Sequence, residues 1–166
     1  MFHQTAMTAG KVTKGHSSGK PLNFMELALE EARLAGARGE VPVGALIVRD
    51  GEIIARAHNR PIELHDPTAH AEMLAIREAG KKLASERLEE CDLYVTLEPC
   101  AMCAAAISFA RIRRLYFGAQ DVKGGAVENG VRFFADPTCH HHPEIYGGID
   151  DVRASALLKD FFKTRR

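Results

Sequence analysis

The sequence predicts an α/β protein in which a mixed β-sheet packs against helices. Two observations support this class. The chain has 166 residues, of which 46% are hydrophobic and 27% are charged, which suits one domain with a single core. Its segments read in order as a helix, a hairpin of two strands, and then strands that alternate with helices. The sequence contains no internal repeat and no sign of a second domain.

Residues 1–22 are expected to form a flexible leader, because they are rich in Lys, Gly, Ser and Thr and show no apolar period. They lack the apolar core of a secretory signal. A mitochondrial transit peptide is the alternative, since the segment is basic and free of acids, although it contains no Arg. The folded domain is expected to span residues 23–166.

The first helix is predicted to begin at Asn23. Asn23 and Glu26 have the spacing of a capping box, and apolar residues then recur at helical spacing. Val43 to Val48 is predicted to be a strand, Asp50-Gly51 a two-residue turn, and Ile53 to Ala57 the returning strand.

The segment from Asn59 to Pro67 contains two prolines and is predicted to be a loop. A helix is expected from about Ala69 to Ala79. Gly80 is expected to end this helix, because glycine readily adopts the left-handed conformation that follows many helices.

The second half of the chain is predicted to continue with a strand from Leu93 to Leu97. Pro99 suits the first position of a helix that runs from about Cys100 to Ala110. The remaining predicted elements are a strand over Arg113 to Gly118, a mostly irregular stretch over 119–143 with a short helix near Val131 to Phe134, and a final helix from Asp150 or Asp151 to Phe162.

Charge is balanced overall but unevenly distributed. Lys plus Arg and Asp plus Glu number 22 each, so no global basic field indicates a nucleic-acid binder. Residues 1–24 and residues 151–166 each carry +3, whereas the body between them carries −6. A polyanionic partner is therefore expected to meet the termini, and solvated charged tails are the alternative. No apolar run approaches the ~18 residues of a membrane span, so no membrane partner is expected.

Two short motifs carry the most informative side chains, an H-x-E motif at His70 and a P-C-x-x-C motif at Cys100 and Cys103. Cysteines at positions i and i+3 of a helix start lie on one face and can share a metal ion. His70, Cys100 and Cys103 are three candidate zinc ligands, which leaves one coordination position for water. Glu72 is expected to reach that water and to carry its proton.

Two other interpretations of these residues remain open. A structural zinc site would close its coordination sphere with a fourth protein ligand, for which Cys139, His140, His141 and His142 are candidates. A Cys-x-x-Cys pair also occurs in redox proteins, although that chemistry is expected in a thioredoxin-like context. Because two of the four cysteines have the spacing of metal ligands, reduced thiols and a cytoplasmic location are expected.

The combination of H-x-E with P-C-x-x-C resembles the signature of zinc-dependent nucleobase deaminases. Further segments are similar to bacterial tRNA-specific adenosine deaminases, within the cytidine/deoxycytidylate deaminase superfamily. The similarity covers about residues 22–166, whereas residues 124–135 and 139–142 depart from the pattern of that family. It is carried by Val41 to Ala45, His58 to Pro61, His65 to Glu72, Leu93 to Cys103, Phe117 to Ala119 and the ending from Leu157 to Arg166.

This resemblance implies a three-layer α/β/α sandwich with a mixed central sheet, as in cytidine deaminases. It implies hydrolysis of the wobble adenosine of tRNA to inosine, chiefly in the arginine tRNA with anticodon ACG. It further implies one zinc ion per subunit on His70, Cys100 and Cys103, Glu72 as proton carrier, and a homodimer. A deaminase of a free base or nucleoside, of guanine or cytosine type, is the alternative within the superfamily. A non-catalytic zinc module that binds RNA or a partner subunit is the alternative outside it.

The resemblance also implies where the tRNA anticodon stem-loop would bind. Asn59 would hydrogen-bond the flipped base, because an amide offers both a donor and an acceptor, and Val41 would pack nearby. Asp121 and Lys123 would hold the neighbouring nucleotides. The other implied contacts are Phe161 or Phe162 with Lys163, Arg165 and Arg166. Alternatively, Asn59 is a turn residue, and at least one of the two phenylalanines belongs to the core.

The helix predicted over Cys100 to Ala110 is rich in small apolar residues and is expected to be buried on both sides. A central position in a monomer core is one explanation, and a dimer interface is the other. The resemblance favours the dimer. Cys91 is expected to be a buried small hydrophobe.

Overall fold

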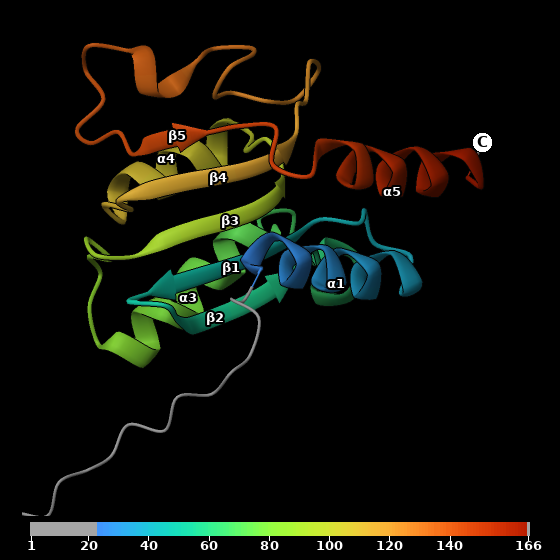
Figure 1. The fold of residues 1–166 in the computed structure, drawn as a ribbon, viewed down its shortest axis with the longest axis horizontal. Coiled ribbons are helices and arrows are strands. Elements are labelled where there is room, and N and C mark those ends of the chain that lie inside the picture. The colour runs from blue at the N-terminus through green and yellow to red at the C-terminus, as the bar shows by residue number, and fades with distance from the viewer. Residues whose placement is uncertain (1–22, 166) are drawn as a thin grey trace, which may run out of the picture.

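A five-stranded mixed sheet forms the centre of the molecule, with strand order β2-β1-β3-β4-β5 (Figure 1). The structure is a computed structural model that describes residues 23–165; the predicted leader over 1–22 and Arg166 lie outside the described residues. The antiparallel pairs join β1 (Gly44–Arg49) to β2 (Glu52–His58) and to β3 (Asp92–Leu97), and the parallel pairs join β3 to β4 (Arg114–Ala119) and β4 to β5 (Glu144–Tyr146). The predicted mixed sheet is confirmed.

Helices cover both faces of the sheet, which confirms the predicted three-layer sandwich. The layer on one face contains α1 (Phe24–Ala37) and α5 (Asp151–Lys163), and the layer on the other contains α3 (Ala71–Leu83) and α4 (Ala101–Phe109) (Figure 1). Side chains of β1 alternate between the two layers, as the strand period requires. Ala45 and Ile47 belong to the main core with α3 and α4, whereas Leu46 and Val48 pack with α1.

The first helix and the hairpin form as the sequence predicts. Oδ1 of Asn23 accepts a hydrogen bond from the backbone N–H of Glu26 at 3.2 Å, which caps α1. In the turn between β1 and β2, Asp50 and Gly51 have φ values of 51° and 75°, the left-handed pair that a type I′ turn requires. At Gly44, an added Cβ would lie 2.0 Å from a backbone oxygen of α1, so this glycine lets α1 approach the sheet closely.

The prediction that Gly80 ends the third helix is wrong, because α3 continues to Leu83. Ala84 ends the helix with φ 50°. The N–H groups of Ala84 and Ser85 donate to the carbonyls of Lys81 and Gly80, at 3.3 and 3.0 Å, in the Schellman arrangement. Leu83 packs against the main core, so the packing of the last turn extends the helix past the glycine.

Three further predicted boundaries differ from the structure. Pro99 precedes α4 instead of opening it, because Cys100 is the N-cap residue. The predicted loop after β2 contains the short helix α2 (Pro61–Leu64), whose first N–H groups are bound by Glu40. The short helix expected near residues 131–134 is a 3₁₀ helix over Phe133–Ala135. The strand β5 was not predicted, since its three residues are exposed and carry no apolar alternation.

Within one chain helix α4 is buried on one side only, so a central position in a monomer core does not explain its apolar composition. Cys103, Ala104 and Ile107 are fully buried, whereas Phe109 is 67% exposed. Cys91 is buried, as expected. Among the described residues, no helix combines the length and the apolar character that crossing a bilayer requires.

Candidate functional site

Three side chains with metal-binding atoms meet where α3 and α4 begin. His70 precedes α3, Cys100 precedes α4, and Cys103 lies in the first turn of α4. Nδ1 of His70 lies 3.6 Å from Sγ of Cys100 and 3.5 Å from Sγ of Cys103. The three donor atoms all lie within 4.8 Å of one another. The two motifs, which are far apart in the sequence, therefore come together as predicted.

The geometry of this cluster fits zinc. A tetrahedral zinc ion with Zn–S distances of about 2.3 Å and a Zn–N distance of about 2.0 Å holds sulfur and nitrogen roughly 3.6 Å apart. Both sulfur–nitrogen pairs show this separation. One imidazole and two thiolates form a donor set that zinc favours. Three protein ligands leave one tetrahedral position available to a further ligand.

The candidates for a fourth ligand lie elsewhere. Sγ of Cys139 donates to the carbonyl of His141 at 3.0 Å, and Nε2 of His141 lies 2.7 Å from the carbonyl oxygen of Ile112. His140 and His142 are exposed. Within residues 23–165, the cluster at the starts of α3 and α4 is the only group of three or more side chains placed to hold a metal. The structure therefore favours the open, three-ligand site.

The pKa values of the two cysteines in the cluster are shifted in opposite directions. A hydrogen bond from Cys103, supported by one from His70, lowers the pKa of Cys100 to about 4. The hydrogen bond to Cys100, followed by burial, raises the pKa of the Cys103 thiol. Both thiols must be deprotonated to bind zinc, so metal binding would release the proton that Cys103 retains more strongly.

Glu72 lies in the first turn of α3 and is only 4% exposed. Burial raises the pKa of its carboxyl above the usual value, while a hydrogen bond with Cys103 opposes this shift. Glu72 therefore lies directly beside the metal ligands. A buried carboxyl with a raised pKa is suited to act as a general acid and base.

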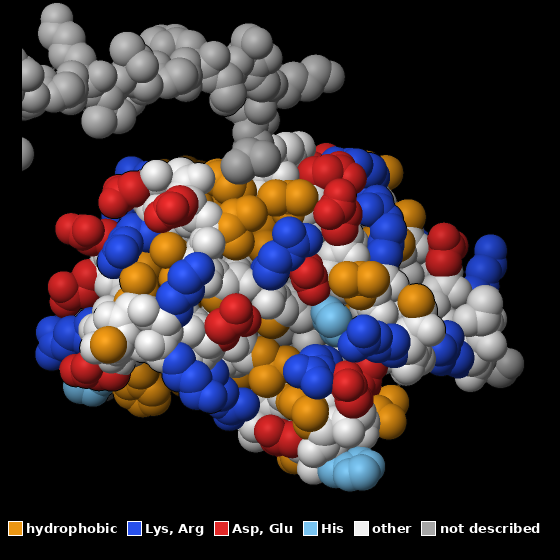
Figure 2. Space-filling model, turned by 90° about the horizontal axis from the view of Figure 1, so that it is seen from below, with side chains coloured by type: hydrophobic (Ala, Val, Ile, Leu, Met, Phe, Trp, Pro, Cys, Tyr) orange, Lys and Arg blue, Asp and Glu red, His pale blue; other side chains and the backbone are white. Residues whose placement is uncertain are grey.

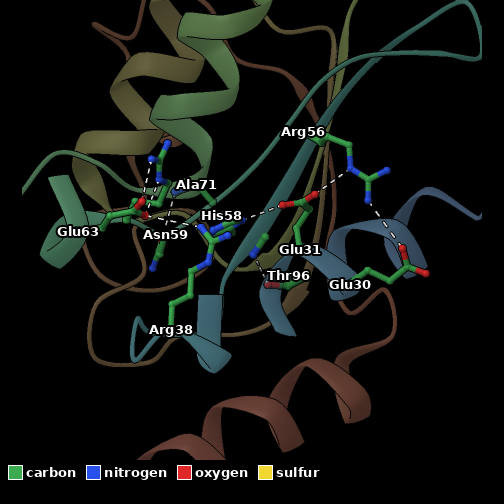
Figure 3. Close-up of polar contacts among 11 residues, drawn as sticks. Glu30, Glu31, Arg38, Arg56, His58, Asn59, Glu63, Ala71 and Thr96 are labelled. Atoms are coloured by element: carbon green, nitrogen blue, oxygen red, sulfur yellow. Dashed lines mark hydrogen bonds and ion pairs between the residues drawn. The ribbon is translucent and has the colours of Figure 1, made fainter. Parts of the chain in front are cut away.

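Asn59 connects the end of β2 to the start of α3 (Figure 3). It is 8% exposed, and its Oδ1 accepts the backbone N–H of Ala71 at 2.8 Å. This hydrogen bond turns the oxygen of the amide towards α3. The NH₂ group therefore points away from α3 and can donate to another partner. The turn and binding interpretations of Asn59 are thus compatible, because one end of the side chain supports the fold and the other faces away from it.

A buried acid of α1 supports the neighbour of Asn59, and the sequence analysis missed it. Nδ1 of His58 and Nε of Arg56 each lie 2.8 Å from the carboxylate of Glu31, which is 7% exposed (Figure 3). Burial alone would raise the pKa of Glu31, but the hydrogen bonds from His58 and Arg56 outweigh burial and lower this pKa. Glu31 stands among the charged residues of an amphipathic helix, so no sequence signal distinguished it.

A groove of about 1020 Å³ lies between the loop after β4 and helix α5. It collects six of the residues predicted to bind substrate, namely Val41, Asp121, Lys123, Phe162, Lys163 and Arg165. Its lining combines four basic side chains with two acidic ones, and Gln120 and apolar side chains complete it. The groove and the metal-ligand cluster both lie at the carboxyl ends of β3 and β4, the edge where open α/β sheets bind ligands.

The two phenylalanines of α5 differ from the prediction that at least one belongs to the core. Phe162 is 48% exposed and lines the groove. Phe161 is half-buried, and the guanidinium of Arg165 lies over its ring, 3.7 Å from the centroid. Helix α5 packs against the sheet through Ala154, Leu157 and Leu158 instead.

The face opposite β5, at the β2 edge of the sheet, is electrostatically mixed. Figure 2 shows Lys and Arg side chains interspersed with Asp and Glu side chains around apolar patches. Arg56 and His58 of β2 both pair with acids of α1. This face therefore presents no single-sign field, in contrast to the mostly basic groove at α5.

Comparison with known proteins is consistent with the geometry. Residues 19–119 match the family described as cytidine and deoxycytidylate deaminase zinc-binding region. A tRNA-specific adenosine deaminase from Agrobacterium fabrum is 63% identical over 144 residues, covering 87% of this chain and 95% of that protein. A tRNA-specific adenosine deaminase from Bacillus subtilis is 43% identical over 143 residues, covering 86% and 89%.

Solved structures show the same fold. One, from a study of A-to-I editing by tRNA:A34 deaminases at the wobble position of transfer RNA, superposes with a TM-score of 0.80 and 65% identity, covering 81% of this chain and 98% of that one. A guanine deaminase from Nitrosomonas europaea superposes with a TM-score of 0.73 and 25% identity, covering 83% and 82%.

Proposed function

Because the chain belongs to the cytidine and deoxycytidylate deaminase family, we propose that it converts the wobble adenosine of a tRNA to inosine by hydrolysis. The observation that carries this proposal is the zinc-fitting cluster of His70, Cys100 and Cys103 beside the buried Glu72. The choice of substrate rests on similarity. A relative named tRNA-specific adenosine deaminase reaches 63% identity, whereas guanine deaminases with the same fold reach 25% and 35%.

The proposed reaction replaces the amino group on C6 of adenine with the oxygen of water. Zinc on the three ligands would lower the pKa of water and so supply a nucleophile near neutral pH. Glu72 takes a proton from the attacking water and delivers it to N1 of the ring, while the bond from oxygen to C6 forms. Glu72 then carries the second water proton to the departing amine, which leaves as ammonia as the C6–N bond breaks. Its burial, at 4% exposure, keeps these protons from bulk solvent.

The residues around the cluster suit an unstacked base and its flanking nucleotides. The NH₂ end of Asn59 would donate to the flipped base, and Val41 would pack beside it. Lys123 and Arg165 would bind phosphates along the groove, with Asp121 ordering the loop that carries Lys123. Phe162 is exposed at the groove and would stack on a base. An anticodon loop supplies such single-stranded nucleotides at little unpairing cost.

A homodimer forms part of this proposal. One side of α4 is packed into the core, whereas Phe109 projects from it and lines hollows on either side. A second copy seated on this face would bury the side of α4 that the single chain leaves open. Sedimentation should then give a dimer for the native chain and a monomer for Phe109→Glu. A native chain that sediments as a monomer would remove the dimer from the proposal.

The four cysteines within residues 23–165 are all free, which supports a reducing, cytoplasmic location. Cys91 is buried and therefore protected, whereas Cys100 and Cys103 must stay reduced to bind metal. A disulfide between these two would abolish metal binding.

The deciding experiment measures inosine formation by the zinc-loaded protein on an arginine tRNA anticodon stem-loop, alongside adenosine, cytidine and guanine. We expect inosine at the wobble position and no change in the free compounds. Turnover of a free base with an inert stem-loop would instead identify a free-base deaminase of the same family. A free-base deaminase should also keep its activity when residues 159–166 are deleted. A tRNA deaminase should instead bind the stem-loop more weakly after this deletion.

A further inference from the structure

Glu98 joins the metal-ligand cluster to the loop at the groove. It follows β3 directly, precedes Pro99 and Cys100, and is 2% exposed. The groove loop, residues 121–129, begins shortly after β4 and supplies Asp121 and Lys123 to the groove. No spacing rule in the sequence distinguishes this glutamate, because its partners lie more than twenty residues away.

The Glu98 carboxylate accepts five hydrogen bonds from this loop. A carboxylate offers about four lone-pair positions, so these five donors saturate it. All five donors are neutral N–H groups, and they converge on one buried charge. The donors to Oε1 are the backbone N–H of Asp121 at 3.1 Å and Nδ2 of Asn129 at 2.7 Å, and those to Oε2 are the backbone N–H groups of Val127 at 3.1 Å, Glu128 at 3.0 Å and Asn129 at 3.0 Å.

The loop is shaped to close around this carboxylate. A Cβ on Gly125 would lie 2.5 Å from both Cδ and Oε2 of Glu98, a distance that real Cβ atoms do not show. Gly130 has φ 59°, which favours glycine, and follows the donors directly. The N–H of Ala126 also donates to the carbonyl of Pro99 at 2.9 Å. The loop is therefore attached to the two residues that immediately precede the metal ligand Cys100.

The same contacts set the position of the substrate-facing part of the loop. The N–H of Asp121 is held by Glu98, and Oδ1 of Asp121 in turn accepts the N–H groups of Lys123 and Gly124, at 3.2 and 2.9 Å. A continuous chain of hydrogen bonds thus runs from Glu98 to the backbone of Lys123. Any shift of Glu98 would therefore be transmitted to Lys123 in the lining of the groove.

We propose that Glu98 is a positioning residue for substrate, which holds Lys123 at a fixed distance from the metal-ligand cluster. This inference rests on the proposed function, because it assigns to the groove loop the nucleotides beside the reacting base. The nucleotide bound at Lys123 and the base that reacts at the cluster belong to one RNA strand. The distance between Lys123 and the cluster must therefore match the distance between these two parts of the substrate. Glu98 sets this distance because its carboxylate binds the groove loop, while its backbone lies only two residues before the metal ligand Cys100.

The test is a double-mutant cycle between Glu98→Gln and Lys123→Ala with the zinc-loaded protein and the anticodon stem-loop. Glutamine replaces one of the two accepting oxygens with an NH₂ group that cannot accept, so the loop N–H donors at that position lose their acceptor. We expect retained zinc, a KM for the stem-loop raised about tenfold and a kcat within about threefold of the native value. In the Glu98→Gln background, Lys123→Ala should add little further loss, because the lysine is already misplaced. Fully additive effects would overturn the inference.

Glu40→Gln is the matched control. Glu40 is also 2% exposed, and its carboxylate accepts the backbone N–H groups of Ile62 and Glu63, both at 3.0 Å. It holds α2 and not the groove loop. Its substitution should lower stability, yet its effect on KM should be independent of Lys123→Ala. If Glu98→Gln and Glu40→Gln were coupled equally to Lys123→Ala, both would act by destabilising the fold in general, and a specific role for Glu98 would be rejected.

A second variant and a second measurement keep the test decisive. Asn129→Ala removes only the 2.7 Å bond to Glu98 and should give the same coupling with a smaller amplitude. Amide exchange of Val127 and Glu128 should be faster in Glu98→Gln with zinc bound, and native protection there would overturn the inference whatever the activity. An inactive native protein would defeat the proposed function, while this exchange measurement would still decide whether Glu98 holds the loop.

Discussion

The metal-ligand cluster and the groove lie at the same edge of the sheet but are built in opposite ways. Cys103 is fully buried and Glu72 is 4% exposed, and both stand on helix starts packed into the core. Lys123 and Phe162 are exposed and come from a loop and from the last helix. The comparison teaches that the chemistry rests on a few buried groups, whereas recognition is shared among many exposed ones. Single substitutions in the cluster should therefore abolish activity or nearly so, whereas single substitutions in the groove should each weaken substrate binding only in part.

The largest effect is expected from Cys103→Ala, which removes one of three metal ligands. Metal analysis of the purified variant should show zinc falling from about one per chain to almost none, with loss of all turnover. Cys91→Ala is the control, because Cys91 is equally buried but lies outside the cluster. Stoichiometric zinc in Cys103→Ala would remove Cys103 from the ligand set.

Glu72→Gln should separate metal binding from proton transfer. The variant should keep its zinc and bind the stem-loop, while kcat falls by about 10²- to 10⁴-fold, the usual contribution of a general acid–base group. Single-turnover kinetics with metal analysis of the same sample provide the measurement. A turnover rate in this variant equal to that of the native protein would contradict the proposed role of Glu72.

Lys123→Ala should produce a moderate effect confined to binding. We expect KM for the stem-loop to rise about tenfold with little change in kcat, and the slope of log affinity against log salt to fall by about 0.7. Lys82→Ala is the matched control, because Lys82 is an exposed lysine on α3 outside the groove. An equal loss in both variants would show that the groove has no special role in binding.

The smallest effect on activity is expected at Glu31, which supports His58 beside Asn59. The folded-state pKa of Glu31 is lowered, so its contribution to stability is present above the unfolded pKa of about 4.3 and is lost as pH falls through the folded value. Glu31→Gln should therefore lower the free energy of unfolding by about 2 kcal/mol at neutral pH. The difference from the native chain should vanish in acid.

Urea unfolding over a range of pH measures this effect, with Glu30→Gln as the control. Glu30 also faces Arg56, but at 3.7 Å and with a side chain that is 51% exposed. Its substitution should change stability by less than about 1 kcal/mol. A Glu31→Gln variant that is less stable by the same amount at every pH would contradict the charge-based explanation.

The sequence by itself determined the local parts of this protein. The cap at Asn23, the turn at Asp50-Gly51 and the mixed sheet are confirmed, because each depends on neighbouring residues and on periodicity. The three metal ligands were also found from the sequence, since the spacing of Cys100 and Cys103 places both thiols on one helix start.

Only the tertiary structure decided the remaining parts, because they depend on contacts between distant segments. Packing of Leu83 carried α3 past Gly80, and β5 exists because β4 offers it an edge. The groove needed α5 to meet the loop after β4. Glu31 and Glu98 read as ordinary acids in the sequence. Their importance appears only where the fold buries each charge and surrounds it with donors from elsewhere in the chain.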